Sequence, residues 1–98
     1  MDQSEEVTKR AHIYIEGRVQ GVDFRYFTKK SAQQMGLNGW VKNRSDGRVE
    51  AVFQGPKKQV MQMVEKCEEG PGSARVENID LKWEEANHKT DSFKIKRF

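Results

Sequence analysis

Hydrophobic side chains recur along the chain with two periods, one of two residues and one of three to four. The short period predicts strands with one buried face, and short strands of this kind are expected at 11–15, 40–42, 48–53, 79–83 and 93–95. The longer period predicts two helices whose apolar residues lie on one face. These faces comprise Phe24, Phe27, Thr28, Ser31, Ala32 and Met35 in the first helix, and Val60, Met63, Val64 and Cys67 in the second.

Glycine and proline mark where the predicted elements end. Gly36 follows the first helix, Gly55 and Pro56 open the second, and Gly70-Pro71-Gly72 closes it. Ser45-Asp46-Gly47 is typical of a tight turn between two strands. The predicted order is β-α-β-β-α-β-β, and its first six elements form the split β-α-β pattern of ferredoxin-like folds. We therefore predict an α+β domain, a ferredoxin-like α/β sandwich with two helices on one face of an antiparallel sheet and a short extra C-terminal strand.

A length of 98 residues allows one domain with one modest core. Residues 1–9 are polar, charged and aperiodic, so we expect a flexible N-terminal extension there and a folded domain over 10–98. A chain of this length has no room for a separate cofactor domain, so any chemistry has to rest on a few side chains and backbone groups. We expect the protein to be a monomer.

The composition narrows the classes of function. Lysine and arginine outnumber aspartate and glutamate by 18 to 15, a mild excess that suits anionic partners, whether phosphate-bearing metabolites or nucleic acid. The single cysteine excludes an internal disulfide, and no Cys/His cluster has zinc-finger spacing. The first residues are too acidic for a signal peptide, and no apolar run reaches membrane length. We therefore expect a cytoplasmic protein.

The segment from Gly17 to Arg25 connects a predicted central strand to a helix. Backbone N–H groups in the first turn of a helix lack intrahelical partners, and the helix dipole favours an anion there. Gly21 lets the backbone curve tightly around a small group, and the guanidinium of Arg25 has the geometry to bind two phosphate oxygens. A glycine turn before a helix is common, however, and an arginine in a first helical turn is usually solvated, so spacing alone does not establish an anion site.

Asn43 ends the predicted strand that begins at Trp40, directly before the turn. An asparagine in this position commonly serves turn geometry. Its amide is also both a donor and an acceptor, which suits it to holding a water molecule by hydrogen bonds. The residue by itself does not decide between the two roles.

Two stretches of the chain resemble the signatures of the acylphosphatase family. Residues 17–25, GRVQGVDFR, are similar to the first signature, which is a glycine and then Val-Gln-Gly-Val, any residue, an aromatic residue and arginine. The second stretch resembles the second signature at every fixed position. It comprises Gly39-Trp40-Val41-Lys42-Asn43 with Gly47, Val49 and Gly55. The similarity runs from about residue 9 to the C-terminus, with the signatures in the family's order and spacing.

The resemblance implies a chemistry as well as a fold. Acylphosphatases are ferredoxin-like α/β sandwiches that hydrolyse the carboxyl-phosphate anhydride of small acyl phosphates to a carboxylate and inorganic phosphate. The family uses no metal or cofactor and forms no phosphoenzyme. By resemblance, Arg25 matches the family's catalytic arginine and Asn43 its water-orienting asparagine. The family's phosphate-binding loop, whose backbone amides hold the phosphate, matches Gln20, Gly21, Val22, Asp23, Phe24 and Arg25.

Asp23 is a departure within that loop. It occupies the variable position of the first signature, where the family often has small or apolar residues. At an effective dielectric of about 20, two like unit charges about 6 Å apart cost roughly 3 kcal/mol, and exposure to solvent reduces this greatly. If Asp23 points to water, its backbone N–H still serves and activity survives. If it points inward, it forms a salt bridge with Arg25 and competes with substrate.

Two alternative functions follow from these observations. One is an acylphosphatase relative that Asp23 has impaired. The other is a nucleic-acid-binding module, because ferredoxin-like sheets also stack RNA bases on exposed aromatic residues, and Tyr14 is a candidate. The sequence run typical of such RNA-binding sheets is absent, which argues against nucleic acid as a partner. Among the remaining residues, we expect His12 to be a solvated sheet histidine and Cys67 a small core residue.

Overall fold

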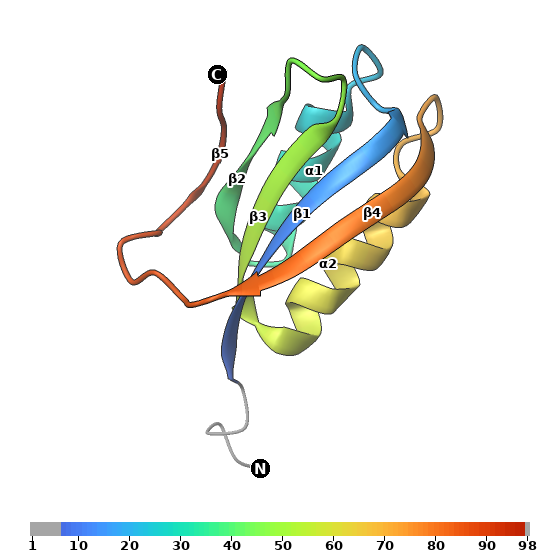
Figure 1. Cartoon of the computed structure of the whole chain (residues 1–98). Helices are drawn as coiled ribbons and strands as arrows, with labels where there is room; N and C mark the ends of the chain where they lie inside the picture. The colour runs from blue at the N-terminus through green and yellow to red at the C-terminus, as the bar shows by residue number, and fades with distance from the viewer. Residues whose placement is uncertain (1–6, 98) are drawn as a thin grey trace.

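The structure, a computed structural model, describes residues 7–97 and has the predicted order of elements (Figure 1). The elements are β1 (Thr8–Arg18), α1 (Phe24–Gln34), β2 (Asn38–Asn43), β3 (Val49–Pro56), α2 (Lys57–Glu69), β4 (Arg75–Glu84) and β5 (Phe93–Ile95). Of the expected N-terminal extension, residues 1–6 lie outside the described residues, whereas Thr8 and Lys9 belong to β1.

The strands form one sheet in the order β4-β1-β3-β2-β5. The four longer strands are antiparallel, as predicted. β5 instead runs parallel to β2, with Phe93 opposite Gly39 and Ile95 opposite Val41. The sheet is therefore mixed, and the prediction of an antiparallel sheet is wrong for its last strand.

The direction of β5 follows from the path of the chain. β4 ends at the end of the sheet where β2 begins, and residues 85–92 cross from one edge of the sheet to the other there (Figure 1). The crossing segment is held on its way, because the Gln54 side chain donates to the Asn87 carbonyl at 2.9 Å and accepts from the Asn87 N–H at 2.8 Å. A chain that reaches the second edge from this end has to run in the direction of β2.

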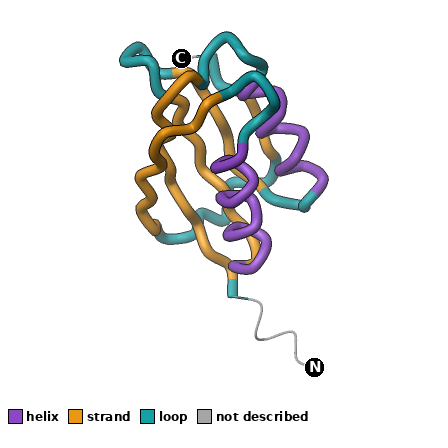
Figure 2. The backbone as a smooth tube through the Cα atoms, turned by 90° about the vertical axis from the view of Figure 1, so that its right-hand side faces the viewer, coloured by secondary structure: helices purple, strands orange, loops and turns teal. Residues whose placement is uncertain are grey.

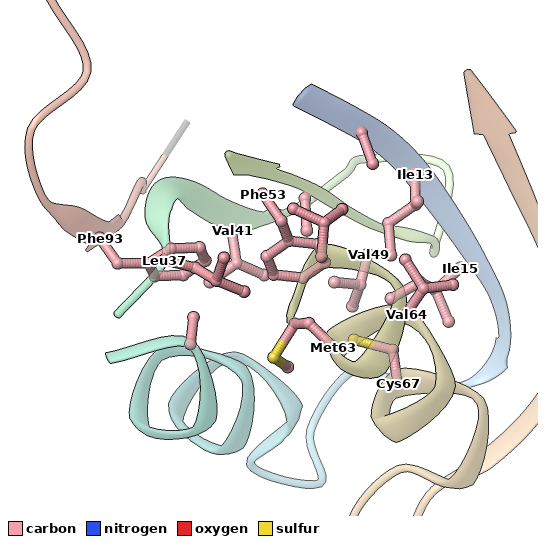
Figure 3. Close-up of a cluster of buried hydrophobic side chains, with 14 of the residues drawn as sticks. Ile13, Ile15, Leu37, Val41, Val49, Phe53, Met63, Val64, Cys67 and Phe93 are labelled. Carbon is pink, nitrogen blue, oxygen red and sulfur yellow. The ribbon is translucent and has the colours of Figure 1, made fainter. Parts of the chain in front are cut away.

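Both helices pack on one face of the sheet, as predicted (Figure 2). The core lies between the helices and the sheet, and complete burial of one large apolar side chain stabilises a fold by about 1.5–3 kcal/mol. This layer therefore holds the strand ends in fixed relative positions. Its buried side chains include Ile13, Ile15, Leu37, Val41, Val49, Phe53, Met63, Val64, Cys67 and Phe93 (Figure 3).

Cys67 is a core residue, as predicted. Its side chain is fully buried, and burial raises the pKa of its thiol to about 12. A thiol without access to solvent and with so little thiolate at neutral pH is a poor nucleophile. The chemistry of the protein has to lie elsewhere.

The opposite face of the sheet carries polar side chains, and His12 is held among them. Its Nε2 lies 2.6 Å from Glu50 Oε2, and its Nδ1 lies 2.6 Å from Glu84 Oε2. Burial alone would raise the pKa of Glu50, but hydrogen bonds from His12 and Arg44 outweigh it and hold that pKa below its usual value. The expectation of a solvated histidine is wrong, because the strands on either side of β1 each bring a carboxylate to it.

Tyr14, the candidate platform for a stacked base, is already covered. The guanidinium carbons of Arg44 and Arg48 lie 5.1 and 4.9 Å from the centre of its ring, and the His12 ring stacks on it at 5.0 Å. A nucleic-acid base would have to displace these neighbours before it could stack. The open face of the sheet therefore adds no support to the nucleic-acid alternative.

Candidate active site

Three strands, β1, β2 and β5, end at the same end of the sheet, beside the N-terminus of α1 (Figure 1). A pocket of about 330 Å³ opens there. Its wall comprises Val19, Gly21, Asp23, Phe24, Arg25, Tyr26, Asn43, Ile95 and Arg97. The fold thus brings Arg25 and Asn43, which are far apart in the sequence, to one pocket.

The 20–25 loop curves through two residues in the left-handed region. Gly21 has φ +75° and Asp23 has φ +63°, and Asp23 is the one non-glycine residue with positive φ between residues 7 and 97. Asp23 also precedes α1 as its N-cap, but its side chain makes no capping hydrogen bond. The first-turn N–H groups of α1 are therefore not occupied by this side chain, and together with the helix dipole they favour an anion in the pocket.

Gly17 shapes the strand end from which this loop leaves. It has φ +128°, and a Cβ atom at this position would lie 2.1 Å from the carbonyl oxygen of Arg75 on β4. The pairing of β1 with β4 shifts register between Glu16 and Gly17, as in a β-bulge. Only glycine allows the two backbones to approach so closely, so Gly17 fixes the point where β1 gives way to the loop.

Asn43 is the last residue of β2 and pairs with Val49 across the hairpin. Its Oδ1 atom is buried and has no hydrogen-bond partner within the described part of the chain. A buried polar atom without a partner costs about 1–3 kcal/mol, so folded proteins contain few of them. Asn43 as a residue lines the pocket, and its amide group can both donate and accept hydrogen bonds, which is the property that the predicted role requires.

Two residues of the 20–25 loop do not line the pocket. The side chain of Val22 packs against the core. The side chain of Gln20 reaches the turn between β2 and β3, where Nε2 donates to the carbonyl oxygens of Arg44 at 2.8 Å and Arg48 at 2.9 Å. If these two residues bind phosphate, as the resemblance implies, they do so through their backbone N–H groups and not through their side chains.

Asp23 takes the outward one of its two expected orientations. The residue is exposed, and no ion pair joins its carboxylate to Arg25 among residues 7–97. It still forms part of the pocket wall, so its charge acts on a bound anion across solvent. Arg25 therefore keeps its guanidinium available for a ligand.

Sequence reasoning missed four residues of the pocket wall. Val19 and Tyr26 flank the 20–25 loop, so their proximity to it was a usable indication. Ile95 and Arg97 belong to the C-terminal segment, which the parallel pairing of β5 brings beside the end of β2. Only the direction of β5 reveals these two, and Arg97 adds a second guanidinium to the pocket.

The pocket combines cationic side chains and a helix N-terminus with one polar amide. This arrangement suits a small anion with a hydrogen-bonded water beside it. No group of three or more His, Cys, Asp or Glu side chains is placed to hold a metal ion anywhere in residues 7–97. None of the described helices has the length and apolar character needed to cross a membrane.

Comparison with known proteins assigns the chain to a family. The acylphosphatase family model matches residues 11–95, a span that includes the 20–25 loop and Asn43. The chain belongs to the acylphosphatase family. Among curated relatives, the acylphosphatase of Roseiflexus sp. (strain RS-1) is 49% identical over 86 residues, which cover 88% of this chain and 92% of the relative.

Solved acylphosphatases share the fold over nearly their whole length. The structure from Coxiella burnetii has a TM-score of 0.88 and 35% identity, and the match covers 98% of this chain and 100% of that one. The structure from Bacillus subtilis has a TM-score of 0.86 and 38% identity, covering 90% and 98%. These matches confirm the ferredoxin-like α+β fold. This acylphosphatase is accordingly a hydrolase whose substrates are small acyl phosphates.

Proposed function

We propose that this acylphosphatase cleaves acyl phosphates by direct attack of a water molecule on phosphorus. In this mechanism Arg25 and the backbone N–H groups of the 20–25 loop hold the phosphate, and Asn43 orients the water. The observation that carries the proposal is that Arg25, Asn43 and the N-terminus of α1 meet at one pocket. Its volume of about 330 Å³ lies within the range of roughly 300–1,000 Å³ typical of small-molecule sites.

Charge complementarity supports the role of Arg25. The phosphoryl group of an acyl phosphate carries close to two negative charges, and its oxygens still carry negative charge in the transition state while the acyl oxygen leaves as a carboxylate. A guanidinium binds two of these oxygens at once, and N–H groups at a helix N-terminus bind another. Since these donors are fixed before the reaction, they stabilise the transition state without reorganising.

The place of Asn43 in the pocket wall supports its role. An amide oxygen that accepts a hydrogen bond from water directs a lone pair of that water away from itself. If the phosphorus lies on that side, the water attacks opposite the acyl oxygen, which is the in-line geometry of phosphoryl transfer. Asn43 therefore contributes by orientation and removes no proton, because a neutral amide is not a base.

The chemistry balances without a general base. The water oxygen forms a bond to phosphorus as the bond from phosphorus to the acyl oxygen breaks, and the bonding electrons leave with the carboxylate. The products are a carboxylate and dihydrogen phosphate, which retains both protons of the water. A carboxylate is a good leaving group, so positioning and electrostatic stabilisation are sufficient to carry the reaction.

The direct test is hydrolysis of benzoyl phosphate or acetyl phosphate by the purified protein in excess EDTA. We expect rapid release of inorganic phosphate at a rate unchanged by EDTA or by added Mg²⁺. When the reaction is run in water enriched in ¹⁸O, incorporation of the label into phosphate and not into the carboxylate identifies attack on phosphorus. Activity that depends on added metal, or label found in the carboxylate, would contradict the proposed mechanism.

Replacing Asp23 with asparagine is expected to lower KM for benzoyl phosphate about threefold at low ionic strength. A unit charge about 6 Å from another costs about 0.7 kcal/mol at the dielectric constant of water, and the amide removes that repulsion. The gain should fade above about 0.15 M salt, where the Debye length is about 8 Å. Steady-state kinetics of the wild type and the variant at two salt concentrations measure this change in KM.

Asp23→Gly separates the charge of this residue from its backbone conformation. This variant should show the same change in KM and, in addition, a higher free energy of unfolding than Asp23→Asn, by about 1 kcal/mol, because glycine adopts φ near +63° without strain. A KM that neither variant changes at low salt would show that Asp23 exerts no repulsion on the substrate. The same result would remove the basis for regarding the protein as an impaired relative.

Several expectations from the sequence stay predictions of ours. These are a monomeric state, a cytoplasmic location, flexibility of the part of the expected N-terminal extension that lies outside the described residues, and the absence of nucleic acid among the partners. Gel filtration with light scattering tests the first. Salt-dependent retention on a nucleic-acid column, without acyl phosphate hydrolysis, would favour the binding alternative instead.

A further inference from the structure

The Gln20 side chain links the two segments that carry the proposed catalytic residues. Its Nε2 atom donates to the carbonyl oxygen of Arg44 at 2.8 Å and to that of Arg48 at 2.9 Å. Gln20 opens the 20–25 loop, and Arg44 is the residue directly after Asn43. Because both partners are carbonyl oxygens, only the nitrogen of the amide can face them, and both of its hydrogens are used.

The two carbonyl groups that Gln20 contacts are also those that close the turn between β2 and β3. The Arg48 oxygen accepts from the Arg44 N–H at 2.8 Å, and the Arg44 oxygen accepts from the Gly47 N–H at 3.2 Å. The Gln20 amide is therefore attached to the rigid base of the turn rather than to its tip. One of the two carbonyl groups that it holds belongs to Arg44, the residue directly after Asn43.

We propose that Gln20 is a positioning residue, whose side chain sets the location of Asn43 relative to the phosphate held by the 20–25 loop. The inference rests on the proposed function, because it concerns the distance and angle between the bound phosphate and the water on Asn43. The Gln20 side chain does not line the pocket. It acts by joining the end of β2 to the loop, so that the two halves of the site move as one.

The turn has other supports, so removing this link should displace it without unfolding it. Arg44 pairs with Asp46 at 3.0 Å and with Glu50 at 3.0 Å, and Arg48 pairs with Asp46 at 2.9 Å. These ion pairs lie within the hairpin of β2 and β3 and do not involve the 20–25 loop. Loss of the Gln20 amide therefore leaves the hairpin closed but frees it from the loop.

A displacement of this kind affects the chemical step more than the binding of phosphate. Phosphate binding uses Arg25 and loop N–H groups, which the Gln20 side chain does not contact. Attack requires the water within a narrow range of distance and angle, and a misplacement of about 1 Å can cost about a hundredfold in rate. We expect kcat to fall by about 10- to 100-fold, with the inhibition constant of inorganic phosphate changed less than about threefold.

The test compares Gln20→Met and Gln20→Glu with the wild type. Methionine keeps the length but offers no donor, and glutamate keeps the shape but turns acceptors toward the two carbonyl oxygens. Gln54→Met is the matched control, because the Gln54 amide also bonds backbone groups, those of Asn87, at the opposite end of the sheet. We measure kcat, KM, inhibition by phosphate and Tm for each.

Amide hydrogen exchange gives a second readout that does not depend on activity. In Gln20→Met, exchange at the Arg44 and Gly47 amides should accelerate at least severalfold, while exchange in the core strands stays as in the wild type. The inference is overturned if these amides keep their rates, or if Gln20→Met and Gln54→Met lose kcat equally. An inactive wild type would instead contradict the proposed function, and exchange would still decide whether Gln20 holds the turn.

Discussion

Replacing Arg25 with alanine is expected to lower kcat/KM for benzoyl phosphate by about a thousandfold. In the proposed mechanism the guanidinium binds the phosphoryl oxygens, and losing one such contact in an active site costs about 10²- to 10³-fold, or more where an arginine stabilises a phosphoryl transition state. Arg25→Lys should recover only part of this loss, because an ammonium group cannot bind two oxygens in one plane. Phosphate release assays measure both variants.

Arg75→Ala is the control for the loss of one positive charge. Arg75 is exposed at the start of β4 and does not line the pocket, so its removal should change kcat/KM less than about twofold. If Arg25→Ala kept most of the wild-type activity, the assignment of Arg25 as the phosphate-binding side chain would be wrong. The nearby Arg97 would then be the next residue to replace, since it is the other guanidinium in the wall.

Asn43→Ala is expected to lower kcat by about 10²- to 10³-fold while inorganic phosphate still inhibits with nearly unchanged affinity. The amide is proposed to orient water and not to hold phosphate, so the loss belongs to the chemical step. Because Oδ1 is a buried atom without a partner, its removal should leave the free energy of unfolding unchanged or raise it by up to about 1 kcal/mol. Kinetics and urea denaturation of the same preparation measure the two effects.

Asn38→Ala provides the matched control on the same strand. Asn38 begins β2 at the far end of the sheet, where its side chain donates to the Thr90 carbonyl at 3.2 Å. Its removal should cost stability of about 1 kcal/mol and leave kcat within about twofold of the wild type. Equal losses of activity in the two asparagine variants would mean that Asn43 acts through the strand and not through a bound water.

The fold was predictable wherever local pattern decides structure. Apolar residues at two spacings defined the strands and helices, and the tight turn at residues 45–47 required β2 and β3 to be antiparallel. β5 has three residues, and its direction depends on how residues 85–92 cross the end of the sheet. That crossing is fixed by contacts such as Gln54 with Asn87, which no short-range pattern reveals.

The same distinction between local pattern and long-range contacts applies to the candidate site. Arg25 and Asn43 both needed the paired signatures. A first-turn arginine after a glycine turn and an asparagine before a tight turn each have an ordinary structural explanation. The side-chain contacts of Gln20 and the carboxylates around His12 join separate strands and loops, so they became visible only once the chain was folded.

The parallel last strand also bears on when the protein becomes an enzyme during folding. Arg25 and Asn43 lie in the first half of the chain, but Ile95 and Arg97, which complete the pocket wall, come from its end. Contacts between segments so distant in sequence form slowly, because the intervening chain must first be ordered. A partly folded molecule with its first hairpin and helix in place therefore lacks one side of the pocket. The return of full activity after dilution from denaturant accordingly reports the docking of β5.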